Sequence, residues 1–250
     1  MNEGDNREEF LANIRLALGK DGPLVDLDIP EETSLSDDRH VLAKRVQAIG
    51  LDRGSRVEQL VEELLTSASE AGWVVSLLGL TDAADYIQQV AQKARATSVL
   101  RSDHKVLEEI GLDSVFNDSS LGIKKIAYEE SGKDKDQQRI EFREDMIVAD
   151  IGVTGVDYAI AETGSVAITA GKGVSRLISL LPPVHVAVVR PSQILPSLDE
   201  LFTIRRNEFL ETGSLNYANI ISGPSRSADI EQTLIKGMHG PREVHMIVLS

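Results

Sequence analysis

The sequence predicts an α/β protein with a mostly parallel sheet flanked by helices and with an N-terminal helical arm. From residue 55 onward, short apolar runs of strand length alternate with segments in which apolar residues recur every three to four positions. This alternation is typical of a parallel sheet that helices cover on both faces. A chain of 250 residues can bury one large core. We therefore expect the arm and a linker over residues 1–54 and the α/β domain over residues 55–250.

The arm is predicted from one amphipathic segment. Residues 6–20 place Phe10, Ile14 and Leu18 on one helical face. Residues 21–38 mix Pro, Gly and acidic residues without a period, which indicates a linker, and a weaker helix is expected over about 37–49. The apolar face of the first helix must be covered, either by its own domain or by a partner.

The first half of the α/β domain is expected to open with a helix–strand–helix unit. An apolar stripe over residues 57–68 predicts a helix that ends at Gly72. The run 73–78 (WVVSLL) predicts a strand buried on both faces, and Thr81 is expected to cap the following helix. Further expected elements are a strand at 98–100, a helix at 105–110, a strand at 123–128 and a solvated loop at 129–138.

The second half begins with strands that are too close together to hold helices between them. Antiparallel pairing is therefore expected in places among the strands at 147–153, 158–161 and 166–169. Regular alternation then resumes. The expected order is a helix at 174–181, a strand at 184–189, a helix at 197–210, a strand at 218–221, a helix at 227–238 and a strand at 244–249.

Composition excludes several classes of function. The net charge is −14, whereas a general nucleic-acid surface needs clustered Lys and Arg. The absence of cysteine excludes disulfides, thiolate nucleophiles and the usual thiolate-ligated metal centres within this chain. The five histidines form no close pair, so no metal site is expected. An acidic N-terminus and the lack of an apolar run near 20 residues predict a cytosolic protein without a membrane span.

The turn Glu162-Thr163-Gly164-Ser165 follows an apolar strand and is the first candidate site. Gly164 permits a positive φ, so that successive N–H groups converge on an anion, and the hydroxyl groups of Thr163 and Ser165 add donors. Glu162 is the candidate catalytic residue, as a partly desolvated general acid, base or nucleophile. A plain hairpin turn with a solvated Glu162 explains the pattern equally well.

A glycine-rich loop, residues 171–176 (GKGVSR), is the second candidate. It matches neither of the two common phosphate-loop patterns. Arg176 is expected to bind a carboxylate or phosphate, since guanidinium groups pair with both in a bidentate manner. An ordinary surface ion pair of Arg176 is the competing interpretation.

The third candidate is SGPSRSAD, residues 222–229, which is expected to open the helix at 227–238. Unpaired N–H groups at a helix N-terminus bind anions. Simple capping by Ser225 or Ser227 accounts for part of the pattern. The residues predicted to bind an anion here are Gly223, Pro224, Ser225, Arg226 and Asp229.

These motifs also carry a family resemblance. The run from AETGSVAITAGKGVSRLISLLPPVHVAVVR onward, with SGPSRSADIEQTLIKGMHGPREVHMIVL downstream, closely resembles the lactate-utilization C-type proteins of the LUD domain family. The resemblance implies a NagB/RpiA/CoA-transferase-like fold and a role beside iron–sulfur partner proteins in oxidising L-lactate to pyruvate. It also implies that the clusters belong to the partners and that this chain holds no cofactor.

Two hypotheses follow from the sequence. The leading one is a cytosolic component of an L-lactate oxidation system that binds a small carboxylate at the two turns, with no redox centre of its own. The alternative is a stand-alone enzyme that acts on an anionic metabolite, of acyl-CoA or sugar-phosphate type by fold analogy, through Glu162. A scaffold in which the motifs only shape turns is a third possibility.

Overall fold

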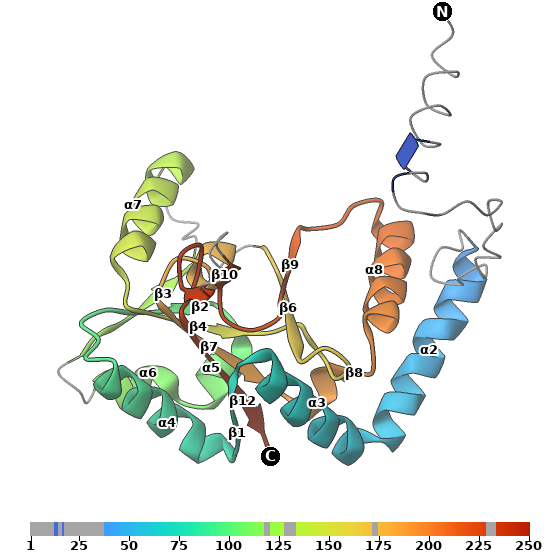
Figure 1. Cartoon of the computed structure of the whole chain (residues 1–250), viewed down its shortest axis with the longest axis horizontal. Coiled ribbons are helices and arrows are strands. Elements are labelled where there is room, and N and C mark those ends of the chain that lie inside the picture. The colour runs from blue at the N-terminus through green and yellow to red at the C-terminus, as the bar shows by residue number, and fades with distance from the viewer. Residues whose placement is uncertain are drawn as a thin grey trace, which may run out of the picture. The chain divides into compact units, whose positions relative to one another are not determined.

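The computed structural model describes residues 13, 14, 17, 38–117, 121–127, 134–171, 175–228 and 234–250 (Figure 1). The chain divides into two compact units, residues 1–32 and 33–250. Most of the helix expected at 6–20 lies outside the described residues, although Asn13, Ile14 and Ala17 are helical. The linker expected at 21–38 also lies outside them, except for Asp38.

A six-stranded parallel sheet forms the centre of the second unit. Every neighbouring pair in it runs parallel, which confirms the predicted α/β class. The strands occur in the order β1-β12-β7-β4-β2-β3. Their bounds are β1 (Val74–Leu78), β2 (Val99–Ser102), β3 (Ile123–Ile126), β4 (Ile151–Gly155), β7 (Val184–Val189) and β12 (Glu243–Leu249).

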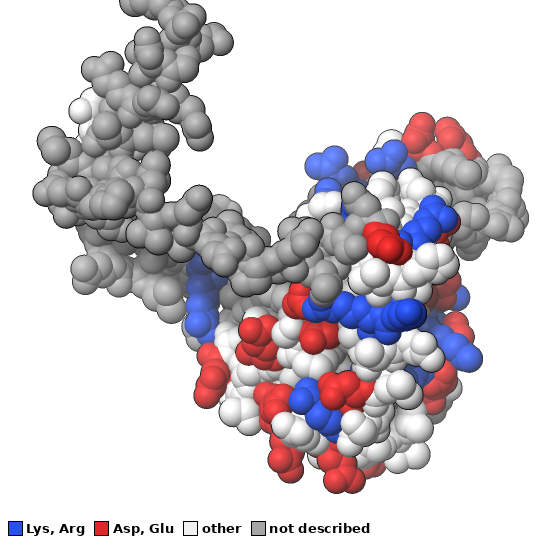
Figure 2. All heavy atoms as spheres, turned by 90° about the vertical axis from the view of Figure 1, so that its right-hand side faces the viewer, with Lys and Arg blue, Asp and Glu red and all other residues white. Residues whose placement is uncertain are grey.

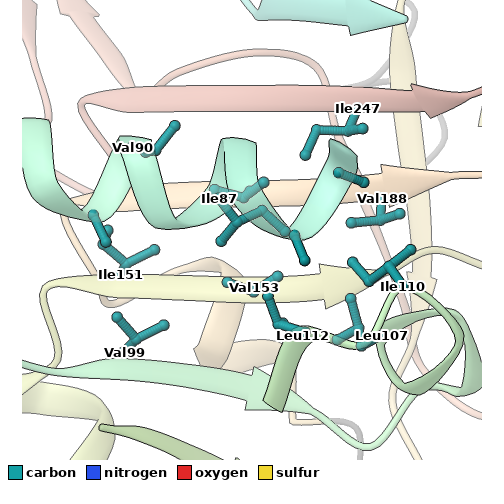
Figure 3. Packing of buried hydrophobic residues seen from close by; sticks show 14 of the residues in the cluster. Ile87, Val90, Val99, Leu107, Ile110, Leu112, Ile151, Val153, Val188 and Ile247 are labelled. Atoms are coloured by element: carbon teal, nitrogen blue, oxygen red, sulfur yellow. The ribbon is translucent and has the colours of Figure 1, made fainter. Parts of the chain in front are cut away.

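Helices cover both faces of this sheet. On one face α4 (Leu80–Lys93), α5 (Lys105–Glu109) and α6 (Leu112–Asn117) pack on the strands through the largest apolar cluster. Figure 3 shows Ile87 and Val90 of α4 lying over strand residues such as Ile151 and Ile247. The other face is covered by α3 (Val57–Ala71) through a second cluster, and by α7 (Lys135–Val148) through a third.

A second sheet has four strands, which neighbour one another in the order β8-β5-β6-β9. Its bounds are β5 (Tyr158–Ile160), β6 (Ser165–Thr169), β8 (Ile194–Leu195) and β9 (Ala218–Ile221). The β5–β6 and β6–β9 pairs are antiparallel, as expected for strands joined by such short connections. Helices α2 (Arg39–Ser55) and α8 (Leu198–Thr212) pack on it, so α2 belongs with the main unit.

Local signals placed several element ends correctly. Helix α3 ends at Gly72, which has φ 99°, as the sequence predicted. Helix α8 begins with a capping box in which Ser197 and Glu200 bond each other's backbone. The expected cap at Thr81 is wrong, because α4 begins after Gly79 and has no side-chain cap. Strand β1 is also not buried on both faces: it is an edge strand with Val74 and Leu77 half-exposed.

Three expected elements differ from the structure. Helix α7 begins within the loop expected at 129–138 and takes in the first residues of the strand expected at 147–153, while residues 129–133 lie outside the described ranges. Asp134 caps the helix by accepting a hydrogen bond from Asp136 N–H. The helix expected at 174–181 is only a 3₁₀ turn, η2 (Arg176–Ser179), in the described residues. The helix expected at 227–238 is wrong, since β10 (Arg226–Ala228) and β11 (Leu234–Lys236) form an antiparallel pair there.

Candidate functional site

The two turns predicted to form the site are neighbours. Strands β6 and β9 pair antiparallel with Val166 opposite Ile221, so the turn before β6 meets the turn after β9. Ser165 Oγ lies 2.6 Å from Ser222 Oγ and accepts a hydrogen bond from Thr163 Oγ1 at 2.8 Å. The predicted proximity is therefore present. A role of these turns in ligand binding stays a prediction.

The glycines of both turns lie against helix α3. Gly164 has φ +61° and Gly223 has φ +99°, the left-handed region that favours glycine. A Cβ on Gly164 would overlap the backbone of Ala68, and a Cβ on Gly223 would overlap the carbonyl oxygen of Ala71. The positive φ expected at Gly164 is confirmed. Helix α3 occupies the space beside both glycines, so the absence of a side chain allows the two turns to pack closely against the helix.

Arg226 contacts the C-terminal end of the same helix. Its Nη2 donates a hydrogen bond to Ala71 O at 2.8 Å. A cation at that end of a helix stabilises the last carbonyl groups. In the described residues 222–228 no helix begins, so the N-terminal N–H groups expected to bind an anion are not available there.

The other residues of this motif also have structural contacts. The backbone N–H of Ser225 donates a hydrogen bond to Pro241 O at 2.8 Å, in the segment before β12. Pro224 packs near Gly72, and Asp229 lies outside the described residues.

Glu162 lies in an acidic groove. The groove has a volume of about 470 Å³ and is lined by Thr66, Ser67, Ala161 and four glutamates, Glu62, Glu63, Glu70 and Glu162. Glu162 is exposed, which contradicts the expected partial desolvation. Because carboxylates repel one another, this groove is unfavourable for an anionic ligand. A catalytic role for Glu162 stays a prediction that the surroundings do not favour.

Arg176 is separate from these turns. Its guanidinium lies 5.0 Å from the ring centroid of Tyr217. Tyr217 O accepts a hydrogen bond from Ala170 N–H, at the end of β6 opposite Ser165. Ala170 lies five positions after Ser165, which corresponds to about 16 Å along extended chain. Arg176 therefore does not share a small-molecule site with the Glu162–Ser165 turn, contrary to expectation.

Arg176 instead lines a cleft between η2, α7 and the end of β3, which we call the arginine cleft. Its volume is about 530 Å³. Three arginines and a single acidic residue give it a positive character within a chain of net charge −14. Its lining consists of Ile126, Asp136, Arg139, Ile140, Phe142, Arg143, Met146, Ser175, Arg176 and Leu177.

The cleft is held open by a packed floor. Ile126, Met146 and Ile178 are buried together with Leu100 and Ala149, which fixes α7 and η2 on the sheet. Gly152 of β4 permits this approach, because a Cβ there would overlap Ile178 O. The short turn is capped by Ser175 Oγ, which accepts a hydrogen bond from Leu177 N–H at 3.3 Å. The three arginines therefore belong to elements, α7 and η2, that pack on the sheet through this cluster.

Two of the three arginines are available to a ligand. Arg139 forms an ion pair with Asp136 at 3.8 Å. Across the ranges that the structure describes, Arg143 and Arg176 form no ion pair, and both are exposed. Guanidinium groups bind carboxylates in a bidentate, planar geometry. The sequence motifs pointed to Arg176 but not to Arg139 and Arg143, although the spacing of four residues between these two is a helical one.

A second group of charged side chains lies where the sheet connections change direction. The chain leaves β2 toward β3 and leaves β4 toward β7, on the opposite side, so the C-terminal ends of β2 and β4 form a topological switch point. His104 lies there against Gly155, whose missing Cβ leaves room for the imidazole. Burial lowers the pKa of His104, nearby Asp157 opposes this, and Arg190 adds to it. No motif in the sequence pointed to this group.

Two negative findings concern the described residues alone. None of their helices has the length and apolar character needed to cross a bilayer. Nor do they contain a group of three or more His, Asp or Glu side chains placed to bind a metal ion.

Similarity to known proteins supports the resemblance seen in the motifs. The LUD domain matches residues 60–249. Lactate utilization protein C of Halalkalibacterium halodurans is 28% identical over 98% of this chain and 97% of that protein. The protein of the same name from Bacillus licheniformis is 31% identical over 70% of each chain.

Two further similarities differ in extent. An uncharacterized electron transport protein of Escherichia coli, YkgF, is 26% identical over 68% of this chain, which spans only 43% of that protein. The crystal structure of a DUF162 family protein from Deinococcus radiodurans shares the fold, with a TM-score of 0.51 at 17% identity over 78% of this chain and 98% of that chain. The LUD domain match covers most of the α/β unit, and the chain belongs to the LUD domain family.

Proposed function

We propose that this protein is a cytosolic component of a lactate utilization system and that it binds an organic carboxylate in the arginine cleft. The proposal of lactate utilization rests on the relatives named lactate utilization protein C. The proposed binding site rests on one observation: the guanidinium groups of Arg143 and Arg176 line one cleft, and neither forms an ion pair within the described ranges.

Electrostatics supports the cleft over the two turns. Over the face shown in Figure 2, acidic and basic side chains are interspersed, so that face offers no broad attraction for anions. An anion must therefore be held by local groups. The arginine cleft concentrates three cationic side chains, whereas four glutamates line the groove at Glu162. Arg226 is already bonded to the end of α3.

We further propose that electron transfer takes place in iron–sulfur partner proteins. Oxidation of lactate to pyruvate releases two electrons, and this chain has no cysteine to ligate a cluster. One relative carries the name of an electron transport protein and is more than twice as long as the matched region. The role left to this chain is to bind the carboxylate and to contact the partners.

The stand-alone enzyme remains the alternative in principle, and it requires Glu162. That residue is exposed and surrounded by like charges, so no feature of its surroundings favours it as a base or nucleophile.

Calorimetric titration of the purified protein with L-lactate and with pyruvate tests the binding site. We expect Arg143→Ala and Arg176→Ala each to weaken binding about 10- to 100-fold, the scale of a hydrogen bond to a charged group. Arg39→Ala is the matched control, because Arg39 is an exposed arginine at the start of α2, outside the cleft. Wild-type affinity in both cleft variants would contradict the proposed site. Normal growth on lactate after deletion of the gene would contradict the proposed pathway.

A further inference from the structure

We propose that the arginine cleft selects carboxylates with an extended apolar body, larger than lactate. The inference rests on the proposed function in one respect, that the cleft binds a carboxylate through its arginines. It adds the size and the chemistry of the rest of the ligand.

The volume of the arginine cleft exceeds the volume of lactate. The cleft measures about 530 Å³, within the range of roughly 300–1,000 Å³ that is typical of sites for larger organic ligands. Lactate has six non-hydrogen atoms. Even at roughly 30 Å³ per atom, the share of one water molecule in the liquid, it would occupy only about a third of the cleft. Lactate alone would leave apolar walls in contact with water.

The lining is the second argument. Five of the ten lining residues are apolar: Ile126, Ile140, Phe142, Met146 and Leu177. Ile126 and Met146 are buried and form the floor, while Ile140 is 60% exposed on α7. A cleft that only had to bind lactate would gain little from these side chains, because lactate offers a single methyl group. An apolar chain would displace water from them, and burial of apolar surface is favourable.

The arrangement of charge gives the ligand a direction. Arg139 is paired with Asp136, which leaves Arg143 and Arg176 for the carboxylate. Arg176 is held over the ring of Tyr217, so its position is defined by a cation–π contact. Ile140 lies one helical turn before Arg143 on α7. A ligand whose carboxylate contacts Arg143 therefore places its chain along the apolar residues of the same helix.

A homologous ligand series tests this inference on the full-length protein. We would titrate the straight-chain carboxylates from acetate to octanoate, together with L-lactate, and the corresponding neutral alcohols as controls for the charge. Each methylene that enters an apolar site is expected to tighten binding about fourfold until the cleft is full. The alcohols are expected to bind much more weakly than the acids of equal length.

Two matched variants locate the apolar contact. Ile140 and Ile147 are both on α7 and are 60% and 59% exposed, but only Ile140 lines the cleft. Ile140→Ser should reduce the gain per methylene, whereas Ile147→Ser should leave it unchanged. Leu177→Ser, on the opposite wall, gives a second test that does not depend on the folding of an α7 variant.

The outcomes separate this inference from the proposed function. Binding of lactate that requires Arg176 but shows no gain with chain length would overturn the inference alone. The absence of binding by any carboxylate would overturn both. Equal affinities for acids and alcohols of the same length, or a gain with chain length that is unaffected by both Ile140→Ser and Leu177→Ser, would overturn the assignment of the ligand to this cleft.

Discussion

Burial of His185 in its neutral form should make the protein markedly less stable at mildly acidic pH. His185 is fully buried on β7, with Nε2 2.9 Å from Thr154 Oγ1 and with no partner for Nδ1 in the described part of the chain. Burial, and then the charge of the neighbouring His245, lowers the pKa of His185 from 6.5 to about 3. The folded protein therefore excludes a proton that the unfolded chain accepts below pH 6.5.

The size of the effect follows from these two pKa values. Above pH 6.5 neither state binds the proton, so the contribution to stability is complete there. As the pH falls from 6.5 toward about 3, the unfolded state is progressively favoured. Between pH 7.5 and pH 5.0 this single residue should lower the free energy of unfolding by about 2 kcal/mol.

Urea denaturation at the two pH values measures this loss. His185→Gln keeps a polar group beside Thr154 but does not titrate, so its loss between pH 7.5 and pH 5.0 should be about 2 kcal/mol smaller than that of the wild type. His40→Gln, at an exposed position on α2, should retain the wild-type pH dependence. An equal loss in wild type and His185→Gln would refute the argument.

Three further predictions concern the two turns and helix α2. Gly164→Ala should destabilise the protein by about 2–5 kcal/mol in urea titrations, because it combines a positive φ with overlap of α3. Gly171→Ala is the control and should be nearly neutral, since no described atom lies within 4 Å of the Cβ position. Arg226→Ala should lower stability by about 0.5–1 kcal/mol through loss of the bond to Ala71 O, and unchanged carboxylate affinity would separate this structural role from ligand binding. Asp38→Ala should cost about 1 kcal/mol, since Asp38 caps α2; a change below about 0.3 kcal/mol in the unfolding free energy would contradict the cap.

Local signals in the sequence predicted much of the fold. The bounds predicted for the strands at 184–189 and 218–221 are those of β7 and β9. Both segments contain β-branched residues and are flanked by turn residues, and this combination favours a strand. The segment 227–238 carried equally local signals for a helix and forms strands instead. β10 and β11 pair with each other although only five residues lie between them in the chain, and strand preferences depend strongly on the surrounding structure, which the local pattern does not show.

The site was less predictable than the fold. Gly164 correctly indicated a positive φ, but the sequence does not show that α3 fills the space beside it. Arg139 and Arg143 are visibly one helical turn apart. That they face Arg176 depends on how α7 and η2 pack on the sheet around Gly152, which no local pattern encodes. Ligand sites built between distant segments are therefore recognised only after folding.

The position of the last strand constrains how this chain is made. β12 (Glu243–Leu249) follows all the other strands in sequence, yet it lies between β1 and β7 in the sheet. During synthesis β1 emerges early and gains its neighbour only after residues 243–249 have left the ribosome. A nascent or truncated chain that stops before Glu243 would leave β1 without its partner and expose both flanking strands. Chaperone dependence and loss of yield on C-terminal truncation are the expected consequences in the cell.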